Sequence, residues 1–140
     1  MNSLFAYGTL RDSDVLEGVL GHGVPPARLR TATARGYAVV FFPGRTYPAI
    51  RRDESDTALG ILVDDISEAE WLRLDTFEGD EYRRAPIEIT VDGRPAIADA
   101  YWPAIDIGLT PPWRFEDWQA RSKEGLLAAA HAAAPLSPSD

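Results

Sequence analysis

The chain has 140 residues, of which 45% are hydrophobic and 26% are charged, a composition typical of one soluble globular domain. Its 14 basic and 22 acidic residues give a formal net charge of -8, which disfavours binding to nucleic acid and to anionic membranes. Because cysteine is absent, a disulfide, a thiolate nucleophile and a cysteine-bound zinc are excluded.

The start of the chain does not resemble a targeting segment. It lacks a basic region and reaches Gly8 before any apolar stretch of signal length. The longest apolar run, Tyr37 to Pro43, is too short to cross a bilayer. We therefore expect a cytoplasmic protein.

The first half of the chain predicts one helix among several strands. A buried strand at 4–7 ends at Gly8, and a helix at 12–20 begins at Asp12 or Ser13 and stops at Gly21. Gly36 separates the next two strands, and a loop is expected at 43–48. The strands expected after the first helix are 28–34, 37–42, 49–52 and 57–63.

The second half predicts a capped helix, a hairpin and a closing helix. Ser67 and Glu70 fit a capping box at the start of a helix that ends near Glu78. Strands at 82–91 and 94–102 flank Asp92-Gly93, a strong hairpin signal. After a loop at 103–112, we expect one helix at 113–133 and a disordered tail at 135–140.

The order of these elements predicts an α+β fold. Strands occur in runs with helices between them, which favours a mixed or antiparallel sheet that could curl into a barrel. We see no linker or internal repeat, so residues 1–134 are expected to form a single domain.

The sequence lacks the common patterns for metal, nucleotide or serine-nucleophile chemistry. His22 and His131 are far apart and are expected to be solvated surface residues, since no local motif supplies partners. Asp53-Glu54-Ser55-Asp56 could offer carboxylates to a metal but is more simply a polar turn. Any chemistry would therefore depend on carboxylates, hydroxyls and backbone amides.

The segment Tyr7-Gly8-Thr9-Leu10 follows a predicted strand and precedes a helix. Glycine allows a sharp turn and leaves room for a ligand beside the backbone. Consecutive amides at such a turn can point the same way and bind an anion such as a carboxylate. The alternative is an ordinary strand-to-helix turn in which Gly8 is needed only for its backbone angles.

Glu78 falls on the apolar face of the helix that follows Ser67. At about 100° per residue, it shares one arc with Trp71, Leu74 and Phe77. A carboxyl on an apolar face is partly desolvated, which raises its pKa and suits it to exchange protons near neutral pH.

Structural alternatives stay open for this segment. Glu78 could pair with Arg83 or Arg84, or fray into solvent at the helix end. Asp75 shares the arc and could accept hydrogen bonds from nearby backbone. Tyr82, four residues after Glu78, could bring its hydroxyl to the same cleft, although a place in the core is the simpler account.

Three segments of the chain, taken together, indicate a protein family more specifically than any one of them does alone. They are FAYGTLR at residues 5–11, LDTFEG at 74–79 followed by Tyr82-Arg83, and Tyr101. In combination they resemble the gamma-glutamylcyclotransferase-like family, over a stretch from Ser3 to about Tyr101. The closing WRFEDW at 113–118 is similar to the end of bacterial members of that family.

The resemblance implies a small mixed, mainly antiparallel β-barrel flanked by helices, with a cavity at one end. It also implies that Glu78 is the catalytic acid/base and that Tyr7, Gly8, Thr9 and Leu10 form the substrate-binding loop, beside which we place Tyr82. Family members release 5-oxoproline from γ-glutamyl compounds without cofactor or metal. The expected partner is thus a small γ-glutamyl molecule, with no nucleic acid and no membrane, and no oligomeric state is predicted.

This activity agrees with the chemistry of the residues. A γ-glutamyl group carries its own nucleophile, the α-amine, which can close a ring on the γ-carbonyl. Glu78 would take a proton from that amine and later deliver one to the departing amine. The amides of Gly8, Thr9 and Leu10 would hold the α-carboxylate or the developing oxyanion.

The leading hypothesis is therefore a cyclotransferase, of acyltransferase or lyase type, acting on a γ-glutamyl amine or peptide. One alternative is a non-catalytic protein that binds a small carboxylate in the same cavity. Another is a different lyase or hydrolase that acts on an amide with the same residues.

Overall fold

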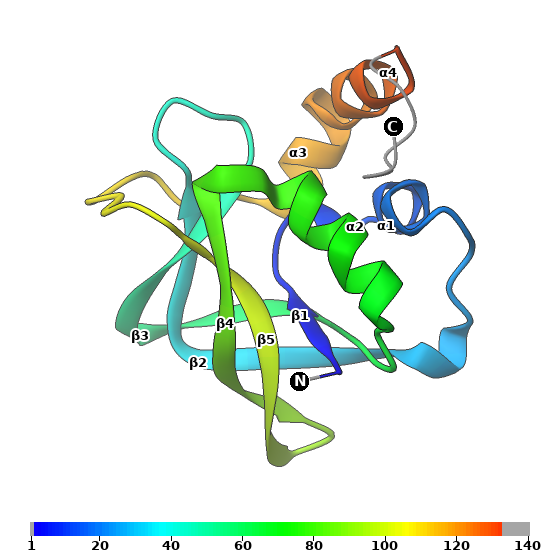
Figure 1. Ribbon diagram of the computed structural model, residues 1–140. Helices are drawn as coiled ribbons and strands as arrows, with labels where there is room; N and C mark the ends of the chain where they lie inside the picture. Colours follow the sequence, from blue (N-terminus) through cyan, green and yellow to red (C-terminus); the bar gives the residue numbers. More distant parts are fainter. Residues whose placement is uncertain (1, 133–140) are drawn as a thin grey trace.

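The computed structural model describes residues 2–132, which contain a five-stranded sheet and helices on one side of it (Figure 1). The strands are β1 (Leu4–Ala6), β2 (Leu29–Phe41), β3 (Pro48–Val63), β4 (Tyr82–Val91) and β5 (Arg94–Pro103). The α-helices are α1 (Ser13–Leu20), α2 (Glu68–Glu78), α3 (Phe115–Arg121) and α4 (Lys123–Ala132). Short 3-10 turns are η1 (Thr9–Arg11), η2 (Pro26–Arg28) and η3 (Gly79–Glu81). The tail predicted at 135–140 lies outside the described residues.

The sheet has the strand order β1-β3-β2-β4-β5 and closes on itself. Neighbouring strands are antiparallel except β1 and β5, which pair in parallel at Leu4 and Asp99. The junction of β2 with β4 is also narrow, at Thr33 and Thr90. The prediction of an α+β fold with a mixed, mainly antiparallel sheet flanked by helices is confirmed.

Two long strands replace the four short ones predicted in the first half. β2 continues through Gly36, whose φ of 88° lets the strand bulge without ending. In β3, Thr57 pairs with Arg35 and Arg52 pairs with Tyr37, so residues 53–56 bulge opposite the glycine. The polar turn predicted at 53–56 corresponds to this bulge in β3. Its hydrogen bonds are made between its own residues, because the Asp53 carboxylate accepts from the amide and hydroxyl of Ser55 at 3.0 and 2.7 Å.

The prediction of one closing helix at 113–133 is also wrong. The structure has two helices, α3 and α4, separated at Ser122, whose φ of -124° and ψ of -17° are not helical. The predicted end at residue 133 lies outside the described part of the chain.

The predicted starts of α1 and α2 are confirmed. Asp12 caps α1 by accepting from the amides of Asp14 and Val15 at 2.9 and 3.2 Å. Ser67 and Glu70 form the capping box of α2, with reciprocal bonds of 3.0 and 3.1 Å. These caps set where each helix begins, and hence which residues its last turn presents.

β1 lies at the centre of the hydrophobic core. Its side chains alternate, so that Leu4 and Ala6 pack with the helices while Phe5 packs inside the curled sheet. Leu4 and Phe5 are fully buried. β1 also passes close to β3 at Gly60, where an added Cβ would lie 2.4 Å from the Ala6 carbonyl oxygen.

We expect Gly60→Ala to destabilise the protein, because the new methyl group would collide with the Ala6 backbone and the Phe5 ring. Overpacking of this kind costs roughly 1–3 kcal/mol. Gly125→Ala is the matched control, since Gly125 is exposed in α4 and no atom lies within 4 Å of the added Cβ. That variant should be stabilised by up to about 1 kcal/mol. Free energies of unfolding from chemical denaturation measure both effects, and equal stability of the two variants would contradict the packing described here.

Candidate functional site

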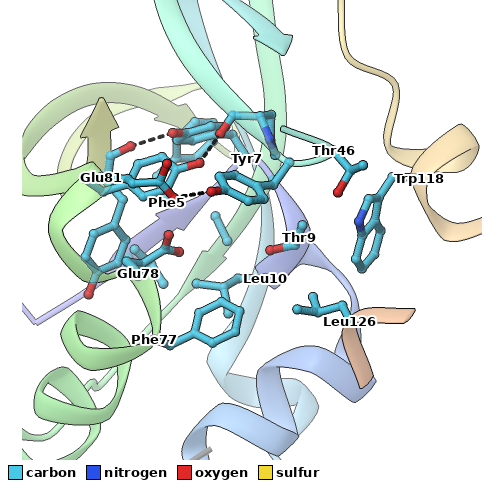
Figure 2. Close-up of a pocket in the computed structure, with 17 residues that line it drawn as sticks. Phe5, Tyr7, Thr9, Leu10, Thr46, Phe77, Glu78, Glu81, Trp118 and Leu126 are labelled. Carbon is cyan, nitrogen blue, oxygen red and sulfur yellow. Dashed lines mark hydrogen bonds between the residues drawn. The ribbon is translucent and has the colours of Figure 1, made fainter. Parts of the chain in front are cut away.

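A cavity of about 190 Å³ lies where the end of β1, the end of α2 and the C-terminal helices meet (Figure 2). All six residues singled out from the sequence line it: Tyr7, Gly8, Thr9, Leu10, Glu78 and Tyr82. The other lining residues come from distant parts of the chain: Leu4, Phe5, Ala6, Thr46, Tyr47, Pro48, Phe77, Glu81, Tyr101, Trp118 and Leu126. The cavity thus joins two sequence motifs about seventy residues apart.

The Tyr7 to Leu10 turn depends on a close approach between neighbouring segments as well as on its backbone angles. The φ of Gly8 is -119°, which is not in the left-handed region that favours glycine. A Cβ at Gly8 would instead come within 2.7 Å of the Pro48 ring, so glycine allows β1 and the start of β3 to approach. The expectation that Gly8 serves only backbone angles is therefore wrong.

The η1 turn that follows leaves backbone donors at its start. Its first hydrogen bond runs from the Arg11 amide to the Gly8 carbonyl at 3.0 Å, so the amides of Thr9 and Leu10 precede the bonded part of the turn. Thr9 and Leu10 are 8% and 4% exposed. Amides in this position can donate hydrogen bonds to an anionic ligand.

Glu78 is the last residue of α2, and its carboxyl points into the cavity toward the turn (Figure 2). Burial, together with the nearby charge of Asp75, raises the pKa of the Glu78 carboxyl to about 8. The alternative of a salt bridge to Arg83 or Arg84 is wrong. Within the described part of the chain, Arg83 is exposed and Arg84 binds Asp75 and Asp99 instead.

Tyr7 and Tyr82 contribute aromatic walls whose hydroxyls are already bonded to backbone. The Tyr7 hydroxyl donates to the Tyr101 carbonyl, and the Tyr82 hydroxyl donates to the Pro48 carbonyl. Burial raises the pKa of both phenols, so they stay protonated. These bonds fix the positions of β1, β5 and the 43–48 loop around the cavity.

A second carboxylate in the cavity, Glu81, was missed in the sequence. It accepts hydrogen bonds from the Tyr47 hydroxyl and from Arg45 Nε, the latter at 3.0 Å. The 43–48 loop that carries these partners shows only turn signals in the sequence, and its contact with Glu81 spans more than thirty residues. Sequence patterns give no sign of such a contact.

Tyr101 and Asp75 form a link at the back of the site. The Tyr101 hydroxyl donates to Asp75 at 2.7 Å, and Arg84 donates to both oxygens of Asp75 at 3.0 and 3.3 Å. Asp75 therefore accepts from side chains, not from backbone as the structural alternative had it.

The C-terminal helices complete the cavity. Trp118 of α3 and Leu126 of α4 line it, and both helices are tied to the cap of α1. Gln119 Nε2 and Lys123 Nζ each lie 2.9 Å from Asp12 Oδ2. One buried carboxylate thus holds the start of α1 and the outer side of the cavity together.

The described residues contain neither a metal-binding cluster nor a membrane-spanning helix. In that part of the chain, no three His, Cys, Asp or Glu side chains are grouped so as to hold a metal ion. His22 lies at the surface, 3.0 Å from Glu70, as predicted, while the prediction for the His131 side chain falls outside the described part. None of the helices described is long and apolar enough to span a membrane.

Comparisons with known proteins agree with the resemblance. The family described as gamma-glutamyl cyclotransferase, AIG2-like, matches residues 4–120. The chain is 31% identical over 132 residues to AIG2-like protein D of Arabidopsis thaliana, covering 91% of this chain and 85% of that protein. The similarity to bacterial members in particular stays a prediction, because this relative is a plant protein.

Solved structures share the fold. The solution structure of an Arabidopsis thaliana protein matches with a TM-score of 0.67 and 24% identity, covering 96% of this chain and 94% of that one. A structure named gamma-glutamyl cyclotransferase matches with a TM-score of 0.65 and 15% identity, covering 79% of this chain and 70% of that one. The chain therefore belongs to the gamma-glutamyl cyclotransferase, AIG2-like family.

Proposed function

We propose that the protein is a cyclotransferase that releases 5-oxoproline from a γ-glutamyl amine or γ-glutamyl peptide, with Glu78 as general acid/base. One observation carries this proposal: a desolvated carboxyl with a pKa of about 8 faces the Tyr7 to Leu10 turn across one small cavity. Membership of the family supports it.

The reaction requires the protein mainly to hold the substrate in one conformation. The α-amine attacks the γ-carbonyl, a carbon–nitrogen bond closes the ring, and the bond from the γ-carbon to the leaving amine breaks. Because nucleophile and electrophile belong to one molecule, a folded conformer held in a cavity gains most of the advantage of proximity. A cavity of about 190 Å³ suits a group the size of one amino acid.

Glu78 would handle the protons of this exchange. A protonated α-amine cannot attack, so the ionised form of Glu78 removes one proton from it. After ring closure the same carboxyl delivers a proton to the departing amine and takes the extra proton from the ring nitrogen. The carboxyl finally returns its proton to solvent or to the free amine, which completes the balance.

The turn opposite Glu78 would bind the anionic parts of the substrate. The amides of Gly8, Thr9 and Leu10 are proposed to hold the α-carboxylate or the oxygen that becomes negative in the transition state. Tyr7 and Tyr82 would enclose the carbon chain between their rings. The leaving group would then extend toward Tyr47 and the 43–48 loop.

We expect Glu78→Gln to lower kcat/KM for 5-oxoproline release by about 10²–10⁴-fold, because the amide cannot exchange a proton. Product formation from a panel of γ-glutamyl amines, amino acids and peptides measures this loss. Glu68→Gln, an exposed carboxylate at the other end of α2, is the control and should retain activity. Full activity in Glu78→Gln would rule out the mechanism. Binding of γ-glutamyl compounds without turnover would favour the non-catalytic alternative.

The proton on Glu78 also affects stability. An ordinary glutamate releases its proton near 4.5, while folding raises the pKa of Glu78 to about 8. Between these pH values the folded protein holds more protons than the unfolded chain, so the free energy of unfolding falls as pH rises. One such group contributes at most about 1.4 kcal/mol per pH unit.

Glu78→Gln removes this titration, so it should gain stability relative to the wild type as pH rises from 5 to 9. At about 3 °C per kcal/mol for a chain of this size, the difference in Tm should widen by several degrees. Thermal melts across this pH range test the expectation, with Glu68→Gln run in parallel. A constant difference would mean that Glu78 titrates like an exposed carboxyl.

A further inference from the structure

Asp75 lies three residues before Glu78 on α2, a spacing that makes them neighbours on the helix surface. Its side chain faces a second hollow on the far side of Tyr82 and Tyr101, which line both this hollow and the cavity. Tyr101 donates to Asp75 at 2.7 Å, and Arg84 binds both its oxygens. Asp75 is therefore held in one position beside the site.

Arg84 is itself restrained by a second carboxylate and by an aromatic ring. It contacts Asp99 at 3.3 Å as well as Asp75, and its guanidinium lies 4.2 Å from the centre of the Trp71 ring. Arg84 thus contacts two carboxylates at once and is held between them. Arg84 lines the second hollow and is not among the residues that line the cavity.

We propose that Asp75, clamped by Arg84 and Tyr101, is the positioning residue of this site, whose fixed charge keeps the proton on Glu78 until a cationic substrate amine enters the cavity. The inference rests on the proposed function, in which Glu78 is the acid/base. It adds a residue that acts through Glu78 without touching the substrate.

The groups around Glu78 support this role because none of the other lining residues supplies a cation. Tyr7 faces it from the turn after β1, Tyr82 from β4 and Tyr101 from β5. Their pKa values are raised by burial, so they remain neutral. Glu81, the other lining carboxylate, is engaged with Tyr47 and Arg45.

Substrate entry would reverse this balance. An ammonium group beside Glu78 favours the carboxylate form, whereas the fixed charge of Asp75 favours the protonated form. The incoming cation therefore displaces the proton, and Glu78 becomes a base only when an amine is there to be deprotonated. An empty cavity keeps a neutral carboxyl, which costs less to bury than a charged one.

Two substitutions with opposite expected signs test the proposal. Asp75→Asn removes the fixed charge and should lower the titration midpoint of Glu78 by roughly one pH unit. Arg84→Gln removes the countercharge, leaves Asp75 in place and should raise the midpoint. Asp80→Asn makes the same change of net charge at an exposed residue two positions after Glu78 and should leave the midpoint unchanged within about 0.2 units.

Carboxyl ¹³C NMR titration of the full chain provides the measurement without any substrate, with the Glu78 signal assigned by its loss in Glu78→Gln. Opposite shifts in Asp75→Asn and Arg84→Gln support the proposal, since a purely structural role would not produce opposite signs. Unmoved midpoints, or shifts in the same direction, overturn it. If Asp75→Asn does not fold, the direction of the Arg84→Gln shift decides alone.

The pH profile of 5-oxoproline release gives a second readout. If Glu78 must ionise in the free enzyme, kcat/KM of Asp75→Asn at pH 6 should exceed that of the wild type by about tenfold for each unit by which the midpoint falls. A wild type with no activity would overturn the proposed function, while the NMR titration would still decide the role of Asp75. An active wild type with an unmoved profile and midpoint in Asp75→Asn would overturn only the present inference.

Discussion

The carboxyl of Glu78 is withdrawn from water at the last turn of α2, and most of the site can be understood as the means of keeping it there. Burial alone would drive such a group to hold its proton, and the charge of Asp75 acts in the same direction. The phenols of Tyr7 and Tyr82 are neutral and donate to backbone carbonyls, so they shape the site without adding charge. A carboxyl near its midpoint at neutral pH can both accept and donate a proton, which is the property that the proposed reaction needs.

The fold provides this environment by bringing backbones unusually close. β1 is only three residues long, yet its side chains pack against the helices on one face and inside the curled sheet on the other, and the chain continues directly into the turn at Gly8. Gly60 lets β3 approach β1, and Gly8 lets the turn approach Pro48. A glycine in the turn and a glycine in β3 thus allow the close approaches of backbone around β1. Larger side chains at either position would push apart the elements that shield Glu78.

Local patterns in the sequence were sufficient for the helix caps and for the side of α2 that carries Glu78. Asp12, Ser67 and Glu70 act through neighbours within three residues, so their roles follow from spacing alone. The same is true of the hairpin at Asp92-Gly93. Placing Glu78 on the apolar arc required only the helical repeat and a correct starting residue.

What the sequence did not predict depends on contacts between distant segments. In the sequence, Gly36 resembles the end of a strand. Only the pairing of β2 with β3, which carries the matching extra residues, shows that both strands continue past this point. Ser122, at the break between α3 and α4, is a residue type favoured just before a helix start, but the helix formers on both sides of it favour one continuous helix. Glu81 joins the site through Tyr47, and Tyr101 is linked to Asp75; both contacts span more than twenty residues, so no local spacing predicts them.

The attachment of α3 and α4 to Asp12 has a consequence for how the cavity comes into being. Trp118 and Leu126 belong to the last part of the described chain, whereas the turn and the helix carrying Glu78 are made much earlier. During synthesis the sheet and the first two helices can associate while one side of the cavity is still missing. Enclosure of the Glu78 carboxyl is therefore a late event, achieved only when Gln119 and Lys123 reach the cap of α1.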